Sequence, residues 1–170
     1  KMTYEWIEHN RLTYNGLANY EWSNDKHSFN VLAGVSYEHY QYQKQKSYRK
    51  NFPTNNMTDL NGGSSAPNDT GTEGGSNENK MLSYFGRVNY SFMDRYLLEA
   101  NLRTDGSSRF HKDHRWGIFP SFSAGWRINQ EAFMQDVSWI NNLKLRASWG
   151  MLGNINNVGD YDYFSTYQQG

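Results

Sequence analysis

The sequence has 170 residues and no cysteine, and its 17 Lys and Arg residues balance its 17 Asp and Glu residues. This length corresponds to one domain or to part of a larger one. The lack of cysteine excludes a disulfide framework and a thiolate metal site, and the balanced charge argues against a nucleic-acid-binding surface. A mean hydropathy of −0.93 excludes a transmembrane helix but not a transmembrane barrel, whose alternating strands average to a hydrophilic value.

The two ends of the sequence resemble internal positions of a longer chain. The first ten residues, KMTYEWIEHN, have neither the apolar segment nor the cleavage site of a signal peptide. The last residues, DYDYFSTYQQG, hold four aromatic side chains that suit the start of a further strand. We therefore expect the 170 residues to be part of a longer protein.

Six segments alternate apolar and polar residues with a period of two, which predicts strands with one apolar and one polar face. Most of them run about 9 to 13 residues, the length that a tilted strand needs to cross a bilayer. The segments are residues 12–22, 29–39, 82–92, 96–106, 116–128 and 143–149. The pattern is clearest in the third, fourth and fifth segments.

The charged residues of these three clearest segments all fall on one side of the alternation. They are Arg87, Glu99, Arg103, Asp105 and Arg127. The opposite side carries no charge and includes Leu98, Phe122 and Ala124. This distribution predicts an uncharged face toward lipid and a charged face toward an aqueous lumen.

Aromatic residues lie near the predicted strand ends, as in the girdles that mark the two interfaces of a membrane barrel. They are Tyr84, Tyr90, Phe92, Tyr96, Trp116 and Trp126. The general preference of aromatic residues for strands is an alternative explanation of the same pattern.

The connections differ in length in the way that the two rims of an outer-membrane barrel differ. On one rim, residues 24–27 and 93–95 predict tight turns, and residues 129–142 predict a brief helix or an irregular turn. On the other rim, residues 106–115 form a longer connection. Residues 43–80 are rich in Gly, Ser and Asn and predict a long, mobile extracellular loop.

Few residues are candidates for catalysis, metal binding or ligand binding. His111, Asp113 and His114 crowd one loop, but without a partner cluster they indicate a solvated loop and not a metal site. No nucleophile and base are paired and no phosphate loop is present, so we expect no catalytic residue, no cofactor and no enzyme activity. The candidates for contact with a polar solute are the lumen-facing Arg87, Glu99 and Arg103, although ion pairs within the lumen are the more frequent use of such charges.

Three strings identify a family. SYFGRVNYSFMDRYLLEANLRTDGSSRF, RWGIFPSFSAGWRINQEAFM and NNLKLRASWGMLGN, which together span most of residues 83–154, resemble the SusC/RagA family of TonB-linked outer-membrane transporters of Bacteroidetes. The resemblance implies that residues 1–170 are part of a barrel of about 22 strands that imports oligosaccharides or peptides. It also implies a plug inside the barrel, a SusD-like surface lipoprotein, and TonB acting through an N-terminal box. The plug, the TonB box and the remaining strands are not among these 170 residues.

Two other hypotheses remain at this point. One is a complete eight-stranded outer-membrane barrel with a structural or adhesive role, in which residues 3–9 and 160–168 supply two further strands. The other is a soluble β-sandwich that binds carbohydrate through exposed aromatic residues. Small side chains on the polar face, such as Ser83, Ser123 and Gly125, favour a wide lumen over a packed small barrel.

Overall fold

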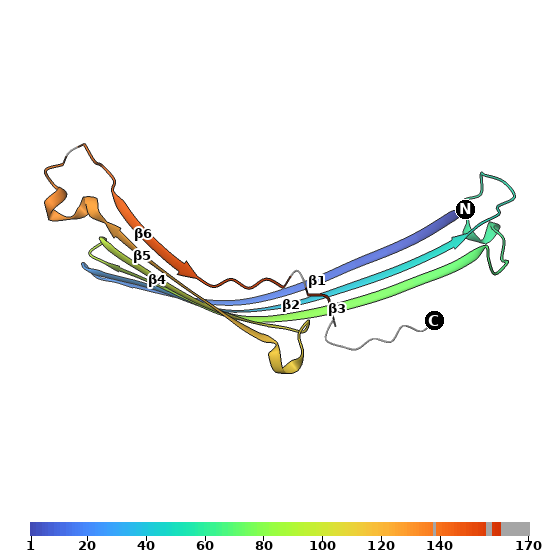
Figure 1. Ribbon diagram of the computed structural model, residues 1–170, viewed down its shortest axis with the longest axis horizontal. Coiled ribbons are helices and arrows are strands. Elements are labelled where there is room, and N and C mark those ends of the chain that lie inside the picture. The colour runs from blue at the N-terminus through green and yellow to red at the C-terminus, as the bar shows by residue number, and fades with distance from the viewer. Residues whose placement is uncertain (138, 156–157, 161–170) are drawn as a thin grey trace. The chain divides into compact units, whose positions relative to one another are not determined.

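The computed structural model describes residues 1–137, 139–155 and 158–160, which form one six-stranded sheet with the strands in chain order (Figure 1). The strands are β1 (Met2–Ser23), β2 (His27–Arg49), β3 (Thr70–Phe92), β4 (Tyr96–Ser107), β5 (Trp116–Arg127) and β6 (Lys144–Gly150). Short 3₁₀ turns occur at η1 (Leu60–Gly62), η2 (Lys112–His114), η3 (Ile128–Gln130) and η4 (Ala132–Met134). The predicted fold class, an all-β antiparallel meander of about six long strands, is confirmed.

No helix among the described residues has the length and apolar character that crossing a membrane requires. Residues 129–142, predicted as a brief helix or irregular turn, hold the end of η3 and all of η4 among the residues that the structure describes. Both turns are too short to bury an apolar face of their own.

The contacts divide the chain into two compact units. The first consists of Lys1–Leu12 and His39–Asn79, and the second of Thr13–Glu38 and Lys80–Gly170. Strands β1, β2 and β3 contribute residues to both units, whereas β4, β5 and β6 belong to the second alone. The apolar alternation recognised in the sequence lies almost entirely in the second unit.

In the first unit, the predicted loop of residues 43–80 is wrong in its bounds. Strand β2 continues to Arg49 and β3 begins at Thr70, so the irregular connection is limited to residues 50–69. Paired strands satisfy the backbone hydrogen bonds of both chains whatever the side chains are, so a polar composition does not exclude them. An ion pair between Lys46 and Glu73 (3.3 Å) and a hydrogen bond between His39 and Glu78 (2.9 Å) join the two strand extensions.

The remaining connection in the first unit is closed by hydrogen bonds. The amide of Lys50 donates to the carbonyl of Asp69 (2.8 Å), and the amide of Ser64 donates to the carbonyl of Lys50 (3.1 Å). The side chain of Asn51 donates to the Asp69 carboxylate at 2.8 Å. Hydrogen bonds from the Ser64 and Asn51 side chains lower the pKa of Asp69 below its ordinary value.

In the second unit, both tight turns lie where the sequence predicts them. Asn24 accepts hydrogen bonds from the amides of Lys26 (3.0 Å) and His27 (2.7 Å), which closes the β1–β2 hairpin. Met93 and Asp94 have φ angles of 51° and 55°, as the two central residues of a type I′ hairpin turn require. This turn has the same right-handed twist as the strands that it joins.

The sheet has no conventional core. Among the described residues no hydrophobic side chain is buried, and the buried residues are Ser83, Ser107 and Glu131. The soluble sandwich hypothesis is therefore wrong, because a sandwich buries its apolar face against a second sheet. The eight-stranded hypothesis expected residues 3–9 to form a separate strand. This is wrong, because residues 3–9 are the first part of β1. Its other strand lies almost wholly outside the described residues.

Candidate functional site

The two faces of the sheet follow directly from the strand register of the second unit. Glu99 pairs with Asn89 on one side and with Ser123 on the other, and Ser123 pairs with Ser148. Residues of the polar alternation thus form continuous rows across β3, β4, β5 and β6. The neighbouring rows repeat the pattern, so charged and amide side chains collect on one face of the sheet.

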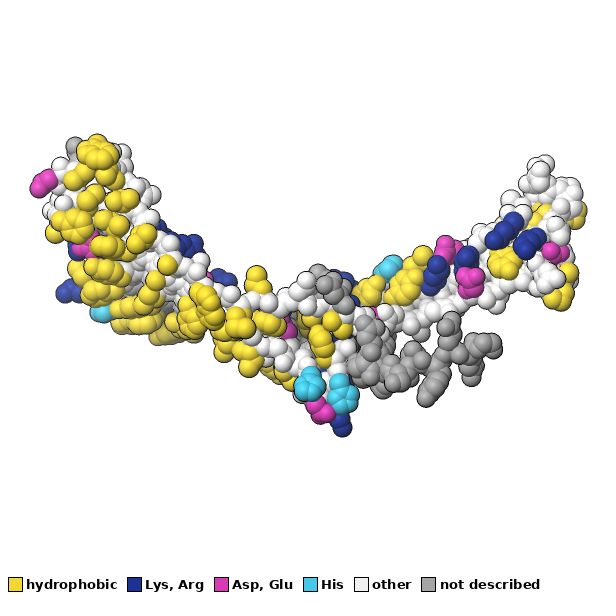
Figure 2. All heavy atoms as spheres, in the orientation of Figure 1, with side chains coloured by type: hydrophobic (Ala, Val, Ile, Leu, Met, Phe, Trp, Pro, Cys, Tyr) yellow, Lys and Arg dark blue, Asp and Glu magenta, His cyan; other side chains and the backbone are white. Residues whose placement is uncertain are grey.

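The opposite face is apolar, uncharged and open. Val88, Ala100, Phe122 and Trp149 form one of its rows, and Leu98 pairs with Ala124 in the next. The side chains of Leu98 and Phe122 are 52% and 54% exposed. Figure 2 shows hydrophobic side chains gathered over the part of the sheet in which Figure 1 labels β4, β5 and β6.

Aromatic rows limit this apolar face at both ends. Near the hairpin turns, the ring of Tyr96 stacks between those of Phe92 (6.3 Å) and Trp126 (6.5 Å). At the other end of the face, near the connection between β4 and β5, the ring of Tyr84 stacks with that of Trp116 at 6.0 Å. From Tyr84 to Phe92 the strand rises roughly 26 Å at about 3.3 Å per residue, close to the height of the apolar band of an outer-membrane barrel.

On the polar face, the three predicted site residues lie in two hydrogen-bonded groups. The first group is linear: Arg87 Nε donates to Asn101 Oδ1 at 2.9 Å, and Asn101 Nδ2 donates to Glu99 Oε1 at 2.8 Å. One amide therefore connects Arg87 to Glu99, and its geometry fixes both side chains along the face. Asn101 was not among the residues predicted for the site.

The second group surrounds Arg103. Its Nε donates to both carboxylate oxygens of Asp105 at 2.8 and 2.9 Å, and its Nη2 donates to Ser83 Oγ at 3.1 Å. The guanidinium also lies 5.9 Å from the centre of the Phe85 ring. Because Arg103 already has these partners, its first role is to hold the polar face together.

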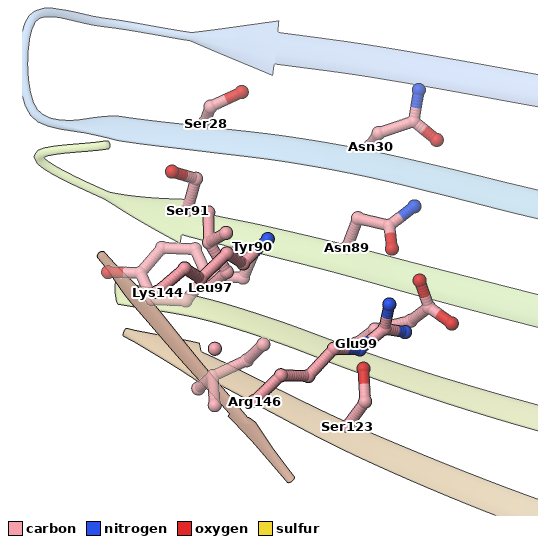
Figure 3. Close-up of a pocket in the computed structure, with 12 residues that line it drawn as sticks. Ser28, Asn30, Asn89, Tyr90, Ser91, Leu97, Glu99, Ser123, Lys144 and Arg146 are labelled. Atoms are coloured by element: carbon pink, nitrogen blue, oxygen red, sulfur yellow. The ribbon is translucent and has the colours of Figure 1, made fainter. Parts of the chain in front are cut away.

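A hollow of about 260 Å³ lies on the polar face near the hairpin-turn end (Figure 3). Glu99 lines it, whereas Arg87 and Arg103 do not. The other lining residues are Ser28, Asn30, Asn89, Tyr90, Ser91, Leu97, Leu98, Ser123, Gly125, Lys144 and Arg146. In Figure 3 the side chain of Arg146 extends from β6 toward Glu99.

Two cations of this hollow were not among the predicted site residues. Lys144 and Arg146 alternate with apolar residues in the sixth predicted strand. This alternation predicts that both side chains lie on the polar face, so the sequence pattern could have identified them. Within the described part of the chain, neither side chain makes a hydrogen bond or an ion pair. Glu99 and these two cations therefore offer acceptor and donor groups to a polar molecule in the hollow.

The comparisons with known proteins agree with this geometry. The chain matches the family model described as "TonB dependent receptor-like, beta-barrel" over residues 3–170. It is 51% identical over 89 residues to the TonB-dependent receptor SusC of Bacteroides thetaiotaomicron, which covers 52% of this chain and 9% of SusC. It is 36% identical over 155 residues to the TonB-dependent receptor P39 of Formosa agariphila, which covers 86% of this chain and 14% of that protein.

A solved structure of the RagAB peptide transporter matches the fold with a TM-score of 0.87 at 27% identity, over 94% of this chain and 18% of the transporter chain. The chain thus spans less than a fifth of the length of each of these relatives. Since the family model covers nearly the whole sequence, the chain belongs to the TonB-dependent receptor-like β-barrel family.

Proposed function

We propose that this chain is a wall segment of a TonB-dependent importer in the bacterial outer membrane. The observation that carries the proposal is the difference between the two faces of one sheet. One face is uncharged and apolar although it is exposed, and the other carries the Arg87–Asn101–Glu99 and Arg103–Asp105 groups. A barrel wall between lipid and an aqueous lumen needs this division.

The open edges of the sheet support a larger barrel around this segment. β1 and β6 end the strand order, so each leaves one row of backbone groups without a partner strand among the described residues. In lipid, every such group costs several kcal/mol. We propose that further strands of the complete protein pair with both edges, giving the barrel of about 22 strands that the resemblance implies.

We propose that the cargo is a large polar nutrient, either an oligosaccharide or a peptide. The likeness to SusC and to the RagAB peptide transporter supports import, and the polar face supplies the contacts. Glu99, Arg87 and Arg103 remain the proposed lumen contacts, and the hollow adds Lys144 and Arg146 to them. Transport through such a lumen involves no covalent chemistry, so no residue is assigned a catalytic role.

The complete importer is proposed to work with two protein partners. A SusD-like lipoprotein covers the extracellular mouth, and TonB acts on an N-terminal box to move a plug inside the barrel. The likeness extends to both the "closed-closed" and "open-open" states of the RagAB importer, with TM-scores of 0.86 and 0.87. This equal match supports a wall that keeps its backbone while other parts of the importer move.

Uptake by the complete transporter tests the proposal. Cells that express it are given fluorescent oligosaccharides and peptides, with and without TonB, and accumulation is measured. We expect TonB-dependent uptake of one class, and a lower rate in Glu99→Gln and Arg146→Gln with normal barrel levels. Ser148→Ala, on the same face, is the matched control and keeps the wild-type rate. Uptake that does not require TonB, or a protein found outside the outer-membrane fraction, contradicts the proposal.

A further inference from the structure

A second cavity, of about 460 Å³, lies on the polar face beside the connection between β4 and β5, and we name it the connection cavity. Five of its lining residues belong to the polar alternation of β3, β4 and β5. They are Met81, Asp105, Ser107, Gly117 and Phe119. The strand register agrees, since Asp105 pairs with Gly117 and Met81 pairs with Ser107. A cavity of this volume is large enough to hold a small organic group.

Two segments outside the sheet complete the walls of the connection cavity. Phe110, His114 and Arg115 come from the connection between β4 and β5, and Gly153, Asn154 and Ile155 follow β6. Arg109 links the two segments. Its side chain pairs with Asp160 at 2.7 Å, and its Nη1 donates to the carbonyls of Ile155 and Val158 at 3.3 Å each. This link uses none of the charged side chains that line the cavity.

The ring of Phe119 gives the connection cavity an apolar floor. A Cβ atom on Gly117 would fall 2.6 Å from Phe119 Cζ, and one on Gly153 would overlap the same ring atom. The ring thus lies against both glycines and joins β5 to the segment that follows β6. Phe110 and Ile155 add apolar side chains to the lining. Contact with these side chains removes an apolar group from water, which favours its binding.

Arg115 carries the unpaired charge of the connection cavity. Both carboxylate oxygens of Asp105 accept from Arg103 Nε, at 2.8 and 2.9 Å, so the charge of Asp105 is already neutralised. Arg115 Nε donates to the carbonyl of Phe110 at 3.2 Å. Within the described residues, its Nη1 and Nη2 make no hydrogen bond and the guanidinium makes no ion pair. The paired N–H donors of a guanidinium match the two oxygens of a carboxylate.

We propose that the connection cavity binds the C-terminal residue of a peptide cargo, with its carboxylate on Arg115 and an apolar side chain against Phe119. The inference rests on the proposed function for import, and it chooses between the two classes of cargo named there. A residue with a free carboxylate and an apolar side chain combines the two chemistries that the cavity places together, one unpaired cation and an apolar floor.

The lining favours the end of a peptide over a sugar. A sugar carries hydroxyl groups around its ring, and each one that loses water needs a hydrogen-bond partner. The Asp105 oxygens are already used, and Phe110, Phe119 and Ile155 offer only apolar side chains. A neutral sugar also leaves the charge of Arg115 unpaired.

Peptide binding to the complete transporter in detergent tests the inference. Alanine pentapeptides that end in leucine and carry a fluorescent label at the N-terminus are compared as free acids and as C-terminal amides. Fluorescence anisotropy measures the dissociation constants. We expect the free acid to bind roughly 10-fold more tightly, as a hydrogen bond to a charged group allows, and a leucine end to bind more tightly than a serine end. These comparisons use the wild-type protein and do not depend on the folding of a variant.

Substitutions locate the effect within the cavity. Arg115→Gln is expected to abolish the preference for the free acid. Arg115→Lys keeps the charge without the paired donors and is expected to retain part of the preference. Phe119→Ala is expected to reduce the preference for leucine over serine. Lys112→Gln removes a cation of the same connection that does not line the cavity, and this matched control is expected to keep the wild-type values.

Three results overturn the inference. They are equal binding of the free acid and the amide to the wild type, an equal loss of preference in the Lys112→Gln control, and tighter binding of a neutral oligosaccharide that Phe119→Ala weakens. The last result identifies a sugar site. Heat-modifiable migration measures barrel assembly for each variant. TonB-dependent uptake by the wild type without a preference for the free acid means that this inference alone fails, whereas the absence of TonB-dependent uptake means that the proposed function fails.

Discussion

Leu98 and Ala124 lie directly opposite each other in the pairing of β4 with β5, and both are exposed on the uncharged face. One residue further along each strand, Glu99 and Ser123 form a pair on the polar face. Ser123 and Ala124 are adjacent in the same strand, and we propose that Ser123 faces water and Ala124 faces lipid. This relationship allows the membrane assignment to be tested with one type of substitution at neighbouring positions.

Ala124→Arg in the complete transporter is expected to block barrel assembly. An arginine near the middle of the lipid face costs about 2–4 kcal/mol, a large part of the stability of an ordinary domain. Heat-modifiable migration of the outer-membrane fraction on a gel measures the assembled barrel. Ser123→Arg places the same side chain on the aqueous face and is expected to leave assembly near the wild-type level. Equal assembly of the two variants shows that the two faces are assigned wrongly.

Gly34→Ala is expected to destabilise the barrel because the ring of Phe85 occupies the space beside Gly34. A Cβ atom there overlaps Phe85 Cζ and falls 2.8 Å from Leu17 Cδ2, well inside contact distance. Overpacking of this kind typically costs about 1–3 kcal/mol. Thermal unfolding of the complete transporter in detergent measures the loss.

Gly86→Ala is the matched control for that prediction. Gly86 is also a mid-strand glycine, but the nearest atom to its added Cβ is the carbonyl oxygen of Leu32 at 3.6 Å, an ordinary contact. The substitution reduces the freedom of the unfolded chain and is expected to be neutral or slightly stabilising. A loss of stability at position 86 equal to that at position 34 means that steric contact with Phe85 is not the cause.

The register and faces of β3, β4 and β5 were predictable from the sequence because one requirement holds along each whole strand. Every second residue must avoid charge on the lipid side, so that side of the three strand segments, residues 82–92, 96–106 and 116–126, carries no charged residue. The same reasoning misjudged residues 70–80. A strand that pairs outside an apolar environment has no face to keep uncharged, and TGTEGGSNENK therefore shows no alternation that distinguishes it from a loop.

The composition of the hollow was only partly predictable. Glu99 was found because its charge lies on the polar side of a strict alternation. Its proximity to Arg146 depends on how β6 pairs with β5, and that register is set by the 16 residues between the two strands, residues 128–143, not within either strand. The role of Glu131 was missed for a similar reason, since its partners come from two strands and from no recognisable motif.

Glu131→Ala is expected to lower the unfolding temperature of the complete transporter. Glu131 is 9% exposed and follows β5, where its carboxylate accepts hydrogen bonds from Tyr96 Oη (2.7 Å), Trp126 Nε1 (3.0 Å) and Arg95 Nη1 (3.2 Å). The alanine variant leaves all three donors without their acceptor. Glu131→Gln keeps one acceptor oxygen for Tyr96 and Trp126 and is expected to lose less. Unfolding temperatures that are the same in all three proteins contradict a structural role for this carboxylate.

The contribution of Glu131 is also expected to disappear in acid. Hydrogen bonds from Tyr96 and then Trp126 hold the pKa of Glu131 below its ordinary value, with the charge of Arg95 adding to the effect. A carboxylate whose pKa is lower in the folded state stabilises that state above its unfolded pKa, and the stabilisation is lost as pH falls through the folded pKa. The difference in unfolding temperature between wild type and Glu131→Gln should therefore be constant from about pH 6 to 8 and shrink below about pH 4. Thermal unfolding of both proteins across this range measures it, with Ser148→Ala as a background control, and a difference that grows in acid would reverse the assigned sign.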